Sequence, residues 1–213
     1  MRQVFITRFG GPAVLQLREA TNPKPQAGEV AIAVKASGIN FADVMARKGL
    51  YPDAPKPPCV VGYEIAGVID GLGAGVQHFE IGQAVLALTR FGGNTDYVCV
   101  PAQQVFSKPA SLSFNSAAAV PVTYLTAYQQ LVVMGSLRAG ESVLIHNAGG
   151  GVGLAALDIA KHLGAITYGT ASASKHAFLR ERGLDFVIDY RTQDWLKILR
   201  ELTNGRGVEL VLD

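Results

Sequence analysis

A glycine-rich turn between two regular segments constrains this chain more than any other feature. The turn reads His-Asn-Ala-Gly-Gly-Gly-Val-Gly over residues 146–153. It follows a short apolar run, 142–146, which is typical of a buried parallel strand, and it precedes apolar residues at helical spacing up to Leu163. A strand, a tight turn and a helix in this order begin a βαβ unit, which requires a parallel sheet with right-handed crossovers.

The alternation of strand and helix continues to the last residue. Further strands are predicted over 165–170, 186–189 and 208–212, with a helix over 174–182 between the first two. Thr192 is expected to cap a last helix, because an apolar face follows it, made of Trp195, Ile198, Leu199 and Leu202. The region therefore predicts an α/β fold with a doubly wound parallel sheet of about four strands.

The glycine turn has the pattern that a dinucleotide phosphate site needs. Gly150 fits the position where the backbone approaches a pyrophosphate, and Gly153 the position where helix packs on strand, while Ala148 occupies the first place of the fingerprint. A helix beginning at Val152 would direct its N-terminal N–H groups at the phosphates. The alternative is a loop that serves only to reverse the chain. The cofactor contacts predicted in this turn are Asn147, Gly150, Gly151, Val152 and Gly153.

The end of the second strand distinguishes between NAD and NADP. NAD sites place an acid there, roughly 20 residues past the glycines, to bind the ribose 2′-hydroxyl. Residues 169–175 contain no acid and instead offer Thr170, Ser172 and Lys175, which suit a 2′-phosphate. Tyr190, after the third strand, adds a hydroxyl or a stacking face. This favours NADPH as cofactor, although Ser172 and Ser174 could also merely cap a helix beside a solvated Lys175.

The first half of the chain has a different composition, rich in glycine and proline. Short strands are predicted over 28–35, 60–61, 65–69, 85–88 and 95–100, the last two joined through Gly92-Gly93. Frequent turns between short strands indicate a β-rich, barrel-like domain. Helical composition begins at Ser116 and continues over 123–134. We therefore predict two domains, 1–115 and 116–213.

Composition excludes several other classes of protein. Apolar residues make up 49% of the 213 residues and charged residues 17%, which supports a packed core. The net charge of +2 and the lack of a basic run give no support for nucleic-acid binding. We find no secretory leader and no apolar stretch that could form a membrane span. The two cysteines, Cys59 and Cys99, form no metal or disulfide pattern, so a cytoplasmic location is expected.

The chain resembles the quinone oxidoreductases of the medium-chain dehydrogenase/reductase superfamily, and within them most closely the vesicle amine transport protein 1 subgroup. The resemblance extends over essentially the whole chain. It is carried by the segments 38–43 (GINFAD), 49–52 (GLYP), 62–68 (GYEIAGV), 126–128 (TAY), 150–153 (GGVG), 169–176 (GTASASKH) and 188–190 (IDY).

The resemblance implies a GroES-like N-terminal domain followed by a Rossmann domain. It further implies that Ser172, Lys175 and Tyr190 hold the 2′-phosphate, and that Asn40 and Thr126 lie near the nicotinamide. Such proteins are typically homodimers. They run to well over 300 residues, so this chain is expected to be truncated at the fourth Rossmann strand. It could then be a fragment, one piece of a two-chain protein, or a short inactive form.

Zinc-dependent relatives have Cys in the position of Asn40 and His in that of Tyr63. Asn and Tyr are poor zinc ligands, so no metal site is expected. Without a Lewis acid, hydride transfer favours quinones or α,β-unsaturated carbonyls as substrates. The catalytic candidates are Asn40, as an amide donor or cofactor contact, with Tyr51 and Tyr63 as hydroxyl donors. Asp43 is expected to orient the loop through a side-chain to backbone hydrogen bond. The alternative function is an NADPH-binding protein with little catalysis, in vesicle or membrane trafficking or another interaction role.

Overall fold

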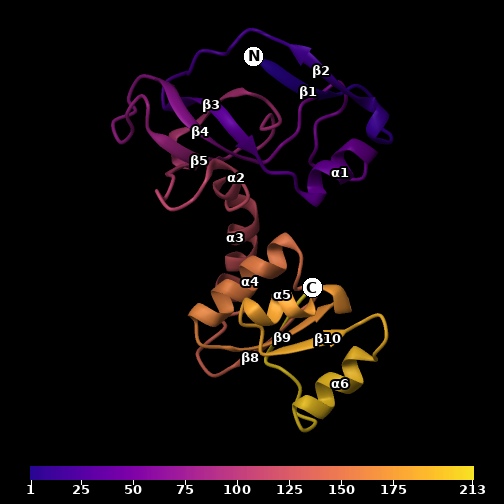
Figure 1. The fold of residues 1–213 in the computed structure, drawn as a ribbon. Coiled ribbons are helices and arrows are strands. Elements are labelled where there is room, and N and C mark those ends of the chain that lie inside the picture. Colours follow the sequence, from indigo (N-terminus) through magenta and orange to yellow (C-terminus); the bar gives the residue numbers. More distant parts are fainter. The chain divides into compact units, whose positions relative to one another are not determined.

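A computed structural model describes all residues from Met1 to Asp213. The chain forms two compact units, Met1–Val122 and Thr123–Asp213, and each is described by itself. Figure 1 traces both, from the indigo N-terminal strands to the yellow residues at the C-terminus. No helix in either unit has the length and apolar character needed to cross a membrane.

The first unit is built on a five-stranded antiparallel sheet with the order β6-β3-β4-β5-β7. Its central strands are rich in β-branched and small apolar residues, and one face of them is fully buried, with Ile32 and Ile65 both at 0% exposure. The strands are β3 (Glu29–Ser37), β4 (Glu64–Leu72), β5 (Ala84–Leu88), β6 (Tyr97–Pro101) and β7 (Val105–Ser107).

Smaller elements complete this unit. The hairpin β1 (Arg2–Ile6) and β2 (Leu15–Glu19) encloses the 3-10 turn η1 (Pro12–Val14). Helix α1 (Phe41–Lys48) begins at the capping residue Asn40 and ends at Gly49, whose φ of 78° is left-handed. The remaining elements are η2 (Ala102–Gln104) and α2 (Phe114–Ala117), which the Ser113 hydroxyl caps.

Two predictions about these strands were wrong. Residues 60–61 form no strand, because Val61 is buried in a small cluster with Ile6, Val14 and Ala46 without pairing in the sheet. Its apolar character reflects this packing. The predicted strands on either side of Gly92-Gly93 both exist but are not neighbours, since β5 pairs with β4 and β7 while β6 pairs with β3.

The second unit confirms the predicted parallel sheet, with the order β10-β9-β8-β11. Its strands are β8 (Ser142–Ile145), β9 (Ile166–Ala171), β10 (Phe186–Asp189) and β11 (Leu210–Leu212). Helix α3 (Pro121–Tyr128) leads into it and continues as a π-helical turn, η3 (Gln129–Met134). The other helices are α4 (Gly151–His162), η4 (Ala173–Lys175), α5 (His176–Glu181) and α6 (Trp195–Leu202).

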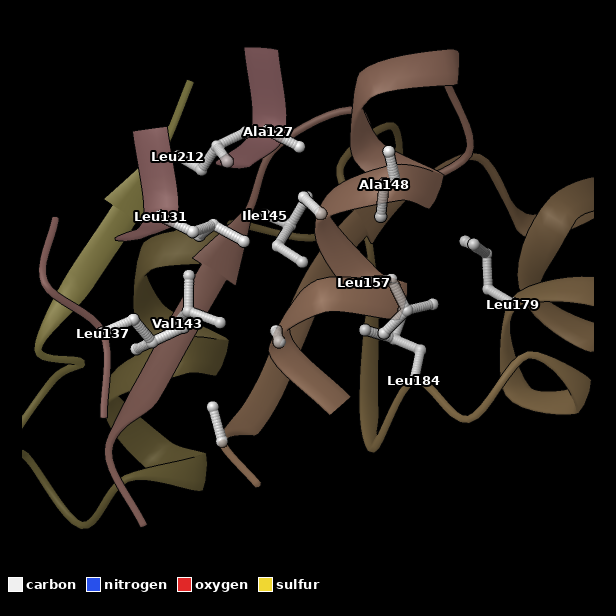
Figure 2. Packing of buried hydrophobic residues seen from close by; sticks show 14 of the residues in the cluster. Ala127, Leu131, Leu137, Val143, Ile145, Ala148, Leu157, Leu179, Leu184 and Leu212 are labelled. Atoms are coloured by element: carbon white, nitrogen blue, oxygen red, sulfur yellow. The ribbon is translucent and has the colours of Figure 1, made fainter. Parts of the chain in front are cut away.

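Helix α4 packs on the sheet through small and branched side chains. Figure 2 shows Val143 and Ile145 on β8 beside Leu157 of α4, in a cluster whose members are nearly all below 6% exposure. Ala148 belongs to the same cluster at 0% exposure. The glycine turn is therefore attached directly to the core of this unit.

Helix α6 corrects one sequence expectation. Its cap is Asp194, whose Oδ1 accepts from the N–H groups of Leu196 (3.1 Å) and Lys197 (3.2 Å). Thr192 instead donates its hydroxyl to Asp189 Oδ2 at 3.0 Å, in the turn that leaves β10. Leu199 is buried as predicted, whereas Leu202 at the end of the helix is 40% exposed.

Candidate functional site

The carboxyl edge of the parallel sheet gathers the residues predicted to bind a nucleotide. Ile145 of β8 is opposite Gly169 of β9, and Ala171 of β9 is opposite Asp189 of β10. The segments that follow these three strands therefore leave the sheet side by side. They are the glycine turn 146–151, the segment 172–175, and residues 190–191. Ligands of open parallel sheets bind at this edge.

The glycine turn is shaped by residues that leave no room for side chains. Asn147 has a left-handed φ of 49°, and its carbonyl accepts from the N–H of Gly150 at 2.8 Å. A Cβ at Gly150 would lie 2.6 Å from Asn147 Nδ2. A Cβ at Gly153 would lie 2.4 Å from Asn147 O and 2.8 Å from Ala148 Cα. Gly153 therefore requires glycine, because backbone atoms occupy the place of a side chain, whereas a Cβ at Gly150 would displace the Asn147 side-chain amide.

Ala148 occupies the place where the fingerprint has its first glycine. Its side chain is buried, and a Cβ built on Gly169 of β9 would lie only 2.8 Å from the Ala148 Cβ. Gly169 thus supplies the space that Ala148 fills. Leu184 Cδ2 would lie at the same 2.8 Å from that Cβ, so the absence of a side chain at Gly169 lets both residues pack against strand β9.

The first turn of α4 offers donors suited to an anion. The first intrahelical bond runs from Leu154 N–H to Gly150 O at 2.9 Å. The N–H groups of Gly151, Val152 and Gly153 precede it and so have no acceptor within the helix. They lie at the positive end of a twelve-residue helix dipole. This cradle of glycines and N–H donors fits a dinucleotide pyrophosphate.

The Thr170 side chain, on strand β9, contacts the start of the glycine turn. The residue is 3% exposed, and its hydroxyl oxygen accepts from the Asn147 N–H at 3.3 Å. The same oxygen lies 3.0 Å from His146 Nδ1, and the His146 ring meets Trp195 edge-on at 4.8 Å. The structure therefore places Thr170 against the protein backbone, where it would act on a nucleotide through the shape of the turn.

Lys175 lies against the glycine turn. Its Nζ donates to the carbonyl oxygen of Gly149 at 2.8 Å, so its ammonium group lies at the turn itself. The Ser172 and Ser174 hydroxyl oxygens are 3.2 Å apart beside it. Tyr190, at the end of the next strand, is 50% exposed.

Arg191 was missed by the sequence reasoning, although a basic residue next to Tyr190 is a readable signal. Its guanidinium carbon lies 5.9 Å from the centre of the Tyr190 ring. It adds a second cation at the end of β10, next to the strand end from which Ser172 and Lys175 follow. Thr126, the remaining predicted cofactor contact in this unit, is half-buried in α3.

In the first unit, Asn40 belongs to a buried polar network. Its side-chain Nδ2 donates to Glu64 Oε1 at 2.8 Å, and Glu64 Oε2 accepts from the Val122 N–H at 2.8 Å. The backbone N–H of Asn40 donates to Asp43 Oδ2 at 2.8 Å, which confirms the loop-orienting bond expected of Asp43. Asn94 Nδ2 donates to Asp43 Oδ1 at 3.2 Å.

Both carboxyl groups of this network are almost fully covered, Glu64 at 1% and Asp43 at 6% exposure. Burial is the main cause that raises the pKa of the Glu64 carboxyl, against the lowering effect of its hydrogen bonds. Burial likewise raises the pKa of Asp43. No three His, Cys, Asp or Glu side chains lie close enough together to bind one metal ion.

Tyr63 and Tyr51 form part of an aromatic cluster in this unit. The Tyr63 ring meets Tyr51 edge-on at 6.0 Å and Phe91 at 5.6 Å. The Tyr63 hydroxyl is buried and has no hydrogen-bond partner. Burial, followed by the charge of Asp43, raises the pKa of Tyr63 to about 12, so this phenol is available only as a neutral donor. Tyr51 is 36% exposed and packs edge-on against the Tyr63 ring.

Comparison with known proteins extends over both units. Residues 26–110 match the alcohol dehydrogenase GroES-like domain, and residues 151–213 match the zinc-binding dehydrogenase family. The synaptic vesicle membrane protein VAT-1 homolog of Rattus norvegicus is 43% identical over 216 residues, covering 100% of this chain and 53% of that protein. The chain therefore spans about half the length of this curated relative.

Solved structures agree with these matches. The CurK enoyl reductase superposes with a TM-score of 0.95 at 34% identity, over 100% of this chain and 66% of that one. The Escherichia coli quinone oxidoreductase complexed with NADPH superposes with a TM-score of 0.93 at 37% identity, again over 100% and 66%. Both units of the expected fold, GroES-like and Rossmann, are thereby confirmed, and the chain belongs to the medium-chain dehydrogenase/reductase superfamily.

Proposed function

We propose that this chain binds NADPH and belongs to a zinc-independent oxidoreductase that reduces quinones or α,β-unsaturated carbonyls. The observation that carries the proposal is the position of Lys175, whose ammonium group lies 2.8 Å from the carbonyl oxygen of Gly149. A cation at the glycine turn, with no acid between Ser172 and Lys175, suits a ribose 2′-phosphate better than a ribose hydroxyl.

The proposed cofactor role divides among the residues of the second unit. Gly151, Val152 and Gly153 would hold the pyrophosphate through their N–H groups, and Gly150 keeps the backbone open for its approach. Ser172, Lys175 and Tyr190 would hold the 2′-phosphate. Bound NADPH supplies a hydride, and the reduced acceptor takes its proton from water.

The donor set in the first unit supports a reaction without zinc. Asn40 and Tyr63 stand where zinc-dependent relatives have Cys and His, and Asn40 is hydrogen-bonded to Glu64. An amide and a neutral phenol are hydrogen-bond donors rather than zinc ligands. Such donors suit acceptors that already delocalise charge, which are the quinones and enones.

Titration of the chain with NADPH and NADH, followed by fluorescence or calorimetry, tests the cofactor assignment. Lys175→Ala should weaken NADPH about 10- to 100-fold, because a hydrogen bond to a charged group contributes roughly 1.5–3 kcal/mol. NADH affinity should change little. Lys197→Ala, which removes a lysine from α6 in the same unit, is the matched control and should bind both nucleotides as the parent does.

Equal losses for NADPH and NADH in Lys175→Ala would contradict the 2′-phosphate assignment. Consumption of NADPH on addition of a quinone or enone tests the reaction itself. Tight NADPH binding without consumption by any acceptor would favour a nucleotide-binding protein, a role that the relationship to a vesicle membrane protein makes relevant.

A further inference from the structure

The carboxylate of Glu64 is held in a space that the chain builds around it. A Cβ at Gly38 would lie 2.2 Å from Glu64 Oε1 and 2.6 Å from Ala118 O, so only glycine leaves room for the carboxylate at this point. The second oxygen accepts from the Val122 N–H at the first turn of α3. Glu64 is therefore fixed at both oxygens and cannot turn away from Asn40.

An ionised carboxylate can only accept hydrogen bonds, so the nitrogen of a neighbouring amide, and not its oxygen, must face it. Asn40 must turn its nitrogen toward Glu64, and this is the observed bond of 2.8 Å. The backbone of Asn40 is held independently by its N–H to Asp43 bond, also 2.8 Å. With the main chain and one amide proton fixed, the second Nδ2 proton is the only donor that the half-buried side chain retains.

We propose that Glu64 is a positioning residue that makes Asn40 present an N–H donor to the carbonyl oxygen of the acceptor. This inference rests on the proposed function and specifies the chemistry of its substrate. Reduction of a quinone or enone places negative charge on that oxygen, and a fixed N–H donor stabilises it more in the transition state than in the ground state. Acceptors without such an oxygen gain nothing from the arrangement.

The orientation of Asn40 can be measured without any turnover. In a ¹⁵N-labelled sample of the whole chain, Asn40→Ala identifies the Asn40 side-chain NH₂ pair by its disappearance. One proton of this pair should be shifted downfield and protected from exchange by its bond to Glu64. In Glu64→Gln, the downfield shift and the protection should be lost, because a glutamine amide can donate to Asn40 and turn it round.

Glu29→Gln is the matched control, since Glu29 lies in β3 of the same sheet, accepts from the Gln26 N–H and does not contact Asn40. It should leave the pair unchanged. Two equivalent, freely exchanging protons in the parent chain would overturn the proposal. That measurement needs no variant beyond the assignment, so it remains decisive if Glu64→Gln does not fold.

Kinetics then separate positioning from structure. Asn40→Ala and Glu64→Gln should each lower kcat about tenfold or more with an enone or quinone, at unchanged KM for NADPH. The double variant should be no slower than Asn40→Ala alone, because Glu64 acts through Asn40. Unchanged kcat in folded Glu64→Gln contradicts the inference. An inactive parent contradicts the proposed function, and the resonance of Asn40 still decides how its amide is oriented.

Discussion

The two units of this chain build their polar sites by opposite means. In the second unit the donors are backbone N–H groups, and glycines give access to them by leaving side chains out. In the first unit the donor is a side chain, held by bonds between residues far apart in sequence, such as Asn40 with Glu64. The first kind of site fails when an atom is added, and the second fails when a hydrogen bond is removed.

Adding one methyl group at Gly153 should give the largest effect. Its Cβ would meet backbone atoms of Asn147 and Ala148 within 2.8 Å, and backbone can yield only by moving α4 away from the turn. Gly153→Ala should lower the free energy of unfolding by about 1–3 kcal/mol and abolish most nucleotide binding. Urea unfolding and nucleotide titration measure the two effects.

Gly151→Ala controls for the change in composition. Its Cβ would meet only the Thr123 methyl group, at 3.0 Å, and alanine favours the helix. Stability close to that of the parent is expected. If both variants lost the same stability, the close contact at Gly153 would not be the cause.

A change of pH should distinguish the first unit from the second, with an effect of intermediate size. Burial raises the pKa of Glu64 above its value in the unfolded chain, so the folded state binds this proton more tightly. Its contribution to stability is therefore present below about pH 4 and is lost as pH rises through the folded pKa. Glu64→Gln removes this titration.

The difference in unfolding free energy between parent and Glu64→Gln should therefore shift in favour of the variant as pH rises. Glu29→Gln, which removes a half-buried carboxylate at the start of β3 in the same sheet, serves again as control. A difference that stayed constant with pH would show that Glu64 titrates alike in the folded and unfolded chain.

Removing the Thr170 hydroxyl, which contacts the glycine turn, should give the smallest effect. Thr170→Val deletes the hydroxyl that contacts the Asn147 N–H and His146 while keeping the shape. We expect a loss of about 1 kcal/mol in stability and a few-fold loss in nucleotide affinity. Thr170→Ser keeps the hydroxyl and should retain the affinity. A larger loss of affinity in the serine variant than in the valine variant would show that packing of the Thr170 methyl group, and not its hydroxyl, is responsible.

The same contrast explains how far the sequence could predict the molecule. Strands and helices of the second unit follow from periodicity and glycines, and β10 has the predicted bounds. The glycine turn follows from local spacing, since all its parts lie within eight residues. Lys175 was predicted by the absence of an acid, although its contact with Gly149 was not.

The network of the first unit could not be read in this way. Its members come from β4, from the start of α1 and from the segment before β6, and nothing local in the sequence pairs Asn40 with Glu64 or Asp43 with Asn94. Val61 shows the same limit, because burial by distant residues gave it the appearance of a strand residue. Asp194 shows a smaller limit of prediction, since Thr192 and Asp194 are both acceptable N-cap residues and lie only two positions apart.

The close contact between Ala148 and Gly169 has a consequence for how such chains are recognised and altered. A search for the pattern Gly-x-Gly-x-x-Gly would pass over residues 148–153, because Ala148 occupies the first place, although four of the following five residues are glycine. Only one of the two positions is closed to a larger residue: alanine at Gly169 would meet both the Ala148 Cβ and Leu184 Cδ2 at 2.8 Å. Ala148→Gly would therefore restore the usual glycine pattern without making room for alanine at Gly169, because the core residue Leu184 would still block that Cβ.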